Sequence, residues 1–128
     1  MLIAILAVLI LASMITNKGN IQVSIENSLL TVTDPEEQEY IIAFSDIQSI
    51  NLQSEIEYGT CIDGKDTDKY KYGTWENNIW DKYSLCVNSR ADKYIVVNSQ
   101  DTVLVFNYNT DYDTNDFYSA FQELLDLK

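Results

Sequence analysis

KYSLCVNSRADKYIVVNSQDTVLVFN, residues 82–107, holds three short apolar segments separated by polar residues. In the first segment Tyr83, Leu85 and Val87 fall on alternate positions, which is the period of a half-buried strand. The pairs Asn88-Ser89 and Asn98-Ser99 are typical of turns. We therefore expect strands at 82–87, 93–97 and 102–107, and because the turns are short we expect an antiparallel meander.

The same alternation extends toward the N-terminus. It predicts further strands at 21–26, 29–33, 39–44, 47–52 and 70–75. Asn27-Ser28 is a plausible tight turn, and 34–37 is a second turn because Pro35 presets its own φ angle. Residues 54–70 are polar and have no sustained period, so we expect a long connection there.

Downstream of the strands the pattern becomes helical. Asp113 to Asp116 reads as a capping box, with negative charge at the positive end of the helix dipole. Apolar residues then recur at helical spacing and form one stripe: Phe117, Phe121, Leu124 and Leu125. The sequence therefore predicts a mainly β domain, a curved antiparallel sheet whose open end is covered by one C-terminal helix.

Residues 1–18 differ from the rest of the chain. Between Leu2 and Ile15 only Ser13 is polar, and the first charge is Lys18. A helix of that length spans about 21 Å, short of the roughly 30 Å hydrocarbon core. We expect a single N-terminal membrane anchor in 1–18 followed by one domain in 19–128; a signal-like segment and a buried core helix are the alternatives. Lys18 alone does not fix the side of the membrane.

The charge of the chain excludes several functions. It carries 8 Lys and Arg against 20 Asp and Glu, a formal net charge of −12, and it has no His. Binding nucleic acid by phosphate neutralisation needs clustered cations, so that class is excluded. Catalysis or metal binding through His is excluded as well. Residues 19–64 contain no Lys or Arg, which argues against binding of anionic lipid headgroups by the domain.

Several short motifs occur in a familiar order: 59–64 (GTCIDG), 69–75 (KYKYGTW), 94–97 (YIVV), 105–107 (VFN), and Thr114 leading to Phe117-Tyr118. With these motifs residues 20–128 resemble a bacterial pleckstrin-homology-like (PH-like) domain. Three positions depart from the family pattern: Cys61 stands where Arg is usual, Trp75 replaces Phe, and Asp81 occupies a Gly position. The resemblance implies a seven-stranded bent antiparallel sheet, a partly open barrel, capped by the C-terminal helix. It implies no particular function, because the fold is a generic binding platform.

Aromatic residues gather in the middle of the chain. Tyr and Trp supply much of the contact energy at protein interfaces, and they also favour ordinary strands and cross-strand pairs. The candidate binding residues, which could line a peptide groove, are Tyr70, Tyr72, Trp75, Trp80 and Tyr83.

The two cysteines, Cys61 and Cys86, match no CxxC metal or redox motif, and no His is present to activate a thiolate. In an oxidising compartment they could form a disulfide worth about 3.5 kcal/mol by loop entropy. In a reducing compartment they are two free thiols. Both possibilities stay open at the level of sequence.

Two acidic groups invite a metal interpretation. Asp111-x-Asp113-x-Asn115 has the opening spacing of a calcium loop, but Asp116 stands at the Gly position and Gln122 at that of the bidentate Glu. Helix capping explains these residues more simply. Asp63, Asp66 and Asp68 form an equally incomplete set. We expect no metal and no cofactor.

These observations favour a membrane-tethered, non-enzymatic module for protein interaction or scaffolding, with an unidentified protein partner. The partner segment would pair with an exposed sheet edge or lie in the groove beside the C-terminal helix. The alternative is a small secreted or surface ligand-binding protein, or a carboxylate-based hydrolase that uses the acidic clusters.

Overall fold

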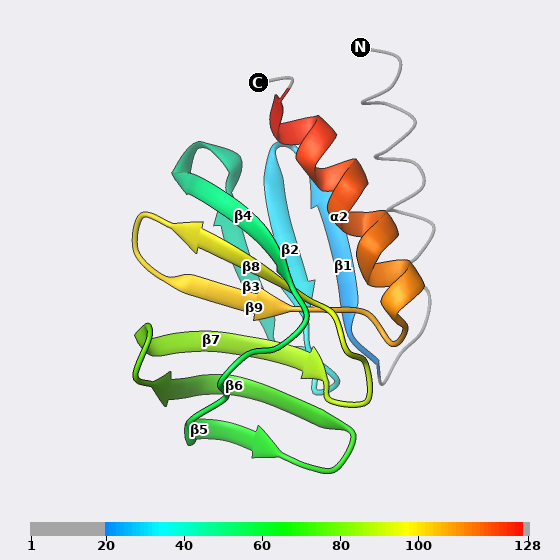
Figure 1. Ribbon diagram of the computed structural model, residues 1–128. Helices are drawn as coiled ribbons and strands as arrows, with labels where there is room; N and C mark the ends of the chain where they lie inside the picture. Colours follow the sequence, from blue (N-terminus) through cyan, green and yellow to red (C-terminus); the bar gives the residue numbers. More distant parts are fainter. Residues whose placement is uncertain (1–19, 127–128) are drawn as a thin grey trace.

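The first three strands form a sheet of their own in the computed structural model, which describes residues 20–126 (Figure 1). β1 (Gln22–Glu26), β2 (Leu29–Thr33) and β3 (Glu39–Ala43) pair antiparallel in that order. Asn27 and Ser28 have φ angles of 55° and 61°, so the predicted tight turn between β1 and β2 is confirmed. Val23 and Ile25, at alternate positions of β1, are buried, and so are Leu30 and Val32 on β2.

A short 3-10 turn, Phe44–Asp46, leads into a second, larger sheet. Its strands are β4 (Ile47–Gln53), β5 (Thr60–Asp66), β6 (Tyr70–Asn77), β7 (Asp81–Asn88), β8 (Tyr94–Ser99) and β9 (Val103–Phe106). They lie side by side in the order β4-β8-β9-β7-β6-β5. β5 and β4 are therefore the two edge strands of this sheet.

The three strands of 82–107 are present, but the predicted meander is wrong. β9 lies between β7 and β8 and runs parallel to β7, with Leu85 opposite Val105. The buried Asn107 side chain fixes this arrangement. Its amide oxygen accepts the N–H of Asn88 at 2.7 Å, and its amide nitrogen donates to the carbonyls of Asn88 and Lys93, each at 3.1 Å. One amide therefore joins the ends of β7 and β9 to the connection that leads into β8.

The prediction that 54–70 is only a connection is also wrong, because β5 lies within it. As an edge strand β5 pairs with β6 alone, and nearly all of its side chains face solvent. An edge strand that is exposed in this way has no apolar alternation, so its sequence resembles that of a loop.

The main core lies between the two sheets and beneath the helix α2 (Asp111–Asp126). Phe117, Phe121 and Leu124 of the predicted stripe are buried there, and Leu125 is half-buried against the same core. The helix begins earlier than predicted, because Thr110 Oγ1 accepts the N–H of Asp113 and so serves as the cap. In Figure 1, α2 lies on the side of the molecule away from β5 and β6.

A second apolar cluster covers the opposite face of the larger sheet. It includes Trp75, Tyr83 and Leu85, and the β4–β5 connection packs against it through Ile56 and Tyr58. The Tyr83 hydroxyl donates to the Tyr58 carbonyl at 2.8 Å, and the hydroxyls of Tyr58 and Tyr94 lie 2.7 Å apart. The connection therefore crosses and shields a face that would otherwise be exposed, as its path in Figure 1 shows.

The fold is thus mainly β with one C-terminal helix, as predicted. The nine strands of residues 20–126 form two sheets that do not close into a barrel, in contrast to the single seven-stranded sheet that the PH-like resemblance implies. Within the same range no helix has both the length and the apolar character needed to cross a membrane. The predicted anchor, 1–18, lies outside the described residues.

Candidate functional site

The five aromatic residues proposed as a binding surface lie on two faces of the larger sheet. Tyr70 and Tyr72 pack into the core between the sheets, whereas Trp75, Trp80 and Tyr83 belong to the cluster on the opposite face. Trp75 and Tyr83 are each only 2% exposed. The five residues therefore do not form one groove, and of them only Tyr72 lines the pocket described below.

The two cysteines are free thiols. β6 lies between their strands, and Cys61 and Cys86 face opposite sides of the sheet. Two strand spacings separate their backbones by about 9–10 Å, beyond the roughly 4.4–6.8 Å between Cα atoms that a disulfide needs. The structure thus has no disulfide here. Burial raises the pKa of the Cys86 thiol well above its ordinary value, which keeps the thiol protonated and unreactive.

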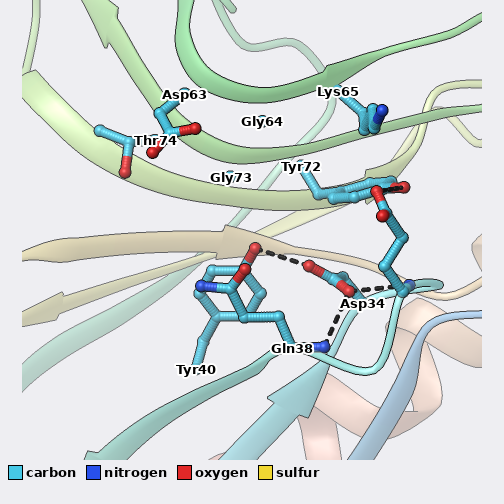
Figure 2. Close-up of a pocket in the computed structure, with 10 residues that line it drawn as sticks. Asp34, Gln38, Tyr40, Asp63, Gly64, Lys65, Tyr72, Gly73 and Thr74 are labelled. Carbon is cyan, nitrogen blue, oxygen red and sulfur yellow. Dashed lines mark hydrogen bonds between the residues drawn. The ribbon is translucent and has the colours of Figure 1, made fainter.

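A pocket of about 440 Å³ opens where the turn between β2 and β3 faces the β5–β6 hairpin (Figure 2). We call it the acidic pocket. The smaller sheet contributes four lining residues: Asp34, Glu36, Gln38 and Tyr40. The larger sheet contributes six: Asp63, Gly64, Lys65, Tyr72, Gly73 and Thr74.

Asp34 organises the lower wall of the acidic pocket. Its side chain is 2% exposed, and Oδ1 accepts the N–H groups of Glu36 at 2.9 Å and Gln38 at 3.0 Å. Oδ2 accepts the Tyr40 hydroxyl at 2.9 Å. Burial, and secondarily this hydrogen bond, raises the pKa of Tyr40. Three donors satisfy the buried carboxylate, so Asp34 holds the turn in shape.

A second tyrosine ties the two walls together. The Tyr72 hydroxyl, on β6, donates at 2.8 Å to Oε1 of Glu36, which lies in the turn between β2 and β3. Burial is the main reason that the pKa of Tyr72 is raised, and the bond to Glu36 adds to it. Because a carboxylate can accept several hydrogen bonds, Glu36 keeps further acceptor capacity toward the pocket.

Glycines allow the close approach of β5 and β6 at the upper wall. Gly73 has a φ angle of +108°, and a Cβ there would lie 2.3 Å from the Asp63 carbonyl oxygen. A Cβ on Gly64 would lie 2.1 Å from the Tyr72 carbonyl oxygen. Only glycine fits either position, so the shape of this wall depends on the pair.

Four side chains of the acidic pocket have no hydrogen bond or ion pair within residues 20–126: Gln38, Asp63, Lys65 and Thr74. Three of the ten lining residues are acidic and one is basic, so the formal charge of the lining is −2. The arrangement offers unused carboxylate, amide, hydroxyl and ammonium groups beside a wall that the Asp34 network keeps rigid.

In each acidic group that suggested a metal, one carboxylate has another partner. Asp111 Oδ1 accepts the N–H of Asp92 at 2.7 Å, and Asp66 is paired with Lys71. Across residues 20–126 no three His, Cys, Asp or Glu side chains are grouped so as to hold a metal ion.

Sequence reasoning treated 34–37 as a turn and 54–70 as a connection, so it missed the acidic pocket. The sequence contains the Asp34-Pro35 pair and, further along, Gly64 and Gly73. Nothing in the local sequence indicates that the 34–37 turn faces the β5–β6 hairpin. No protein-family model, curated protein or solved structure matches the chain. The candidate site is therefore interpreted from its own geometry.

Proposed function

We propose that residues 19–128 form a non-enzymatic protein-interaction module that residues 1–18 tether to a membrane. Kinship with the PH-like family is part of this proposal. The strand-rich chain ending in a helix agrees with such kinship, whereas the parallel pair of β7 and β9 departs from the sheet that the resemblance implies.

The observation that carries the proposal is the exposed edge strand β5. It ends the larger sheet, pairs with β6 alone, and six of its seven residues are exposed, Cys61 being half-buried. Backbone N–H and C=O groups on the outer side of an edge strand are free to pair with another extended chain. Strand addition of this kind is a recurring mode of peptide recognition, in which the backbone supplies affinity and neighbouring pockets supply specificity.

Peptide titration tests the edge. We would titrate the isotope-labelled full chain in lipid nanodiscs with a short extended peptide of Thr and Val, and follow the backbone amides by NMR. The proposal predicts that the largest shifts fall on 60–66 at the β5 edge. A peptide of the same length made only of Pro should produce no such shifts, because it has no amide N–H to donate to the ladder. Shifts confined to other strands, or none at any peptide concentration, would reject the β5 edge as the binding site.

The tether is tested separately by fractionation of membranes. The full chain should sediment with membranes and resist alkaline extraction. Leu6→Asp combined with Leu9→Asp should release it, since each central acid costs about 2.5–3.5 kcal/mol of insertion free energy. The control for added charge is Gln100→Asp combined with Asn115→Asp, because both positions are exposed in the folded domain. Unchanged sedimentation of the Leu6/Leu9 variant would show that 1–18 is not the anchor.

A further inference from the structure

We propose that the partner segment is basic: it adds to the free edge of β5 and places a Lys or Arg side chain in the acidic pocket, beside Asp63 and Glu36. This inference rests on the proposed function and specifies the chemistry of the partner.

The geometry of the β5–β6 hairpin places the acidic pocket within reach of an added strand. Asp63 is opposite Thr74 and Lys65 is opposite Tyr72, and all four side chains line the pocket. They therefore share one face of the sheet. On a strand added to β5, every second side chain lies on that same face, about 4.5–5.5 Å from its neighbour on β5. The residue opposite Asp63 is thus directed toward the pocket.

The charges of the lining select a cation. Three donors already satisfy Asp34, whereas within residues 20–126 the side chain of Glu36 accepts one hydrogen bond and that of Asp63 accepts none. An ammonium or guanidinium group supplies the donors that these two carboxylates lack. The whole chain, at −12, attracts cationic partners over a longer range. The same net charge disfavours a second copy of this chain as the occupant.

The single base of the lining refines the expected motif. Lys65 lies two residues from Asp63 on the same face. The two partner residues opposite Asp63 and Lys65 are therefore also two positions apart. A partner segment can pair with both side chains if a basic residue lies opposite Asp63 and an acidic or hydroxyl residue lies two positions away, opposite Lys65. A uniformly basic segment meets repulsion at Lys65.

The test compares three extended Thr/Val peptides that differ at one central residue, which is Lys, Gln or Glu. Binding to the full chain in nanodiscs is measured by titration calorimetry at low and high salt. We expect the Lys peptide to bind about two- to fivefold more tightly than the Gln peptide, and the Glu peptide to bind more weakly than both. The preference for Lys should shrink at high salt because charges near the surface are screened.

Matched variants locate the preference. Gln38 is exposed and its side chain faces the acidic pocket, so Gln38→Glu should strengthen binding of the Lys peptide about two- to fivefold. Gln100→Glu, in the β8–β9 turn, adds the same charge outside the pocket and should leave the affinity unchanged. Asp63→Asn should weaken binding of the Lys peptide, with Asp101→Asn as its control. A gain of affinity cannot arise from unfolding, so Gln38→Glu keeps the test decisive.

The possible results separate this inference from the proposed function. If all three peptides bind at β5 with equal affinity, the interaction module stands and the basic partner is rejected. If Gln38→Glu and Gln100→Glu have equal effects, the acidic pocket is not the cation site and the inference is rejected. If no peptide binds at any salt concentration, both proposals fall.

Discussion

Tyr40 and Tyr108 illustrate how much depends on a single hydroxyl group. The Tyr40 hydroxyl donates to the buried Asp34 carboxylate at 2.9 Å. The Tyr108 ring packs against Phe117, with 5.4 Å between ring centroids, but within residues 20–126 its buried hydroxyl has no hydrogen-bond partner. The two positions therefore differ in what removal of the oxygen should do.

The matched substitution to Phe makes this difference measurable. Tyr40→Phe should lower the free energy of unfolding by about 1.5–3 kcal/mol, because a hydrogen bond to a charged group is lost. Tyr108→Phe should leave it unchanged or raise it by up to about 1 kcal/mol, because no hydrogen bond is lost and a buried polar atom is removed. Urea unfolding of both variants gives the comparison. An equal loss at both positions would contradict the role assigned to Asp34.

At this scale the sequence predicted one turn that lines the acidic pocket, but not the pocket itself. The Asp-Pro turn at 34–37 could be predicted because Pro35 restricts its own φ angle. Neither the bond from Tyr40 to Asp34 nor the bond from Tyr72 to Glu36 could be predicted. Tyr72 lies on the larger sheet, 36 positions from Glu36 in the sequence.

At the scale of elements, α2 covers the main core with the apolar stripe described above. Phe121 is fully buried and contacts Phe44 and Phe117, with ring centroids 5.7 Å and 5.5 Å away. On the same helix Tyr112 is 76% exposed. The helical period alone located the stripe, because burial on one face of a helix leaves a regular trace in the sequence.

Replacement of each aromatic residue by Ala tests this assignment. Phe121→Ala should lower the free energy of unfolding by about 3–5 kcal/mol, since it opens a cavity among close-packed rings. Tyr112→Ala should change it by less than about 0.5 kcal/mol. Both values come from urea unfolding monitored by far-ultraviolet circular dichroism. A loss below about 1 kcal/mol at Phe121 would mean that α2 does not close the core.

At the scale of the whole molecule, burial makes the fold sensitive to alkali. Burial is the main reason that the pKa values of Tyr83, Cys86 and Tyr108 are raised in the folded chain. Below the ordinary thiol and phenol pKa values, about 8.5 and 10, both the folded and the unfolded chain keep these protons. Above them the unfolded chain loses protons that the folded chain retains, so the unfolded state gains stability.

The free energy of unfolding should therefore be flat near pH 7–8 and fall progressively above about pH 9–10. Each fully linked group contributes up to about 1.4 kcal/mol per pH unit. Urea unfolding across this range, with tyrosinate absorbance as a second probe, measures the slope. Tyr108→Phe removes one of these groups, so the free energy of unfolding should fall less steeply with pH, by the contribution of that one group. Stability that stays constant to about pH 11 would contradict the burial of these three side chains.

The sequence by itself determined the strands that are buried on one face, the Asn27-Ser28 turn and the stripe of α2. Each of these leaves a local, periodic trace, because burial alternates along the element. Only the tertiary structure decided the position of β9 between β7 and β8, the strand character of β5, and the acidic pocket. The first depends on the bonds from Asn107 to Asn88 and Lys93, which join segments distant in sequence. An exposed edge strand buries too little to create a pattern, and a pocket formed between two sheets exists only once the sheets have packed.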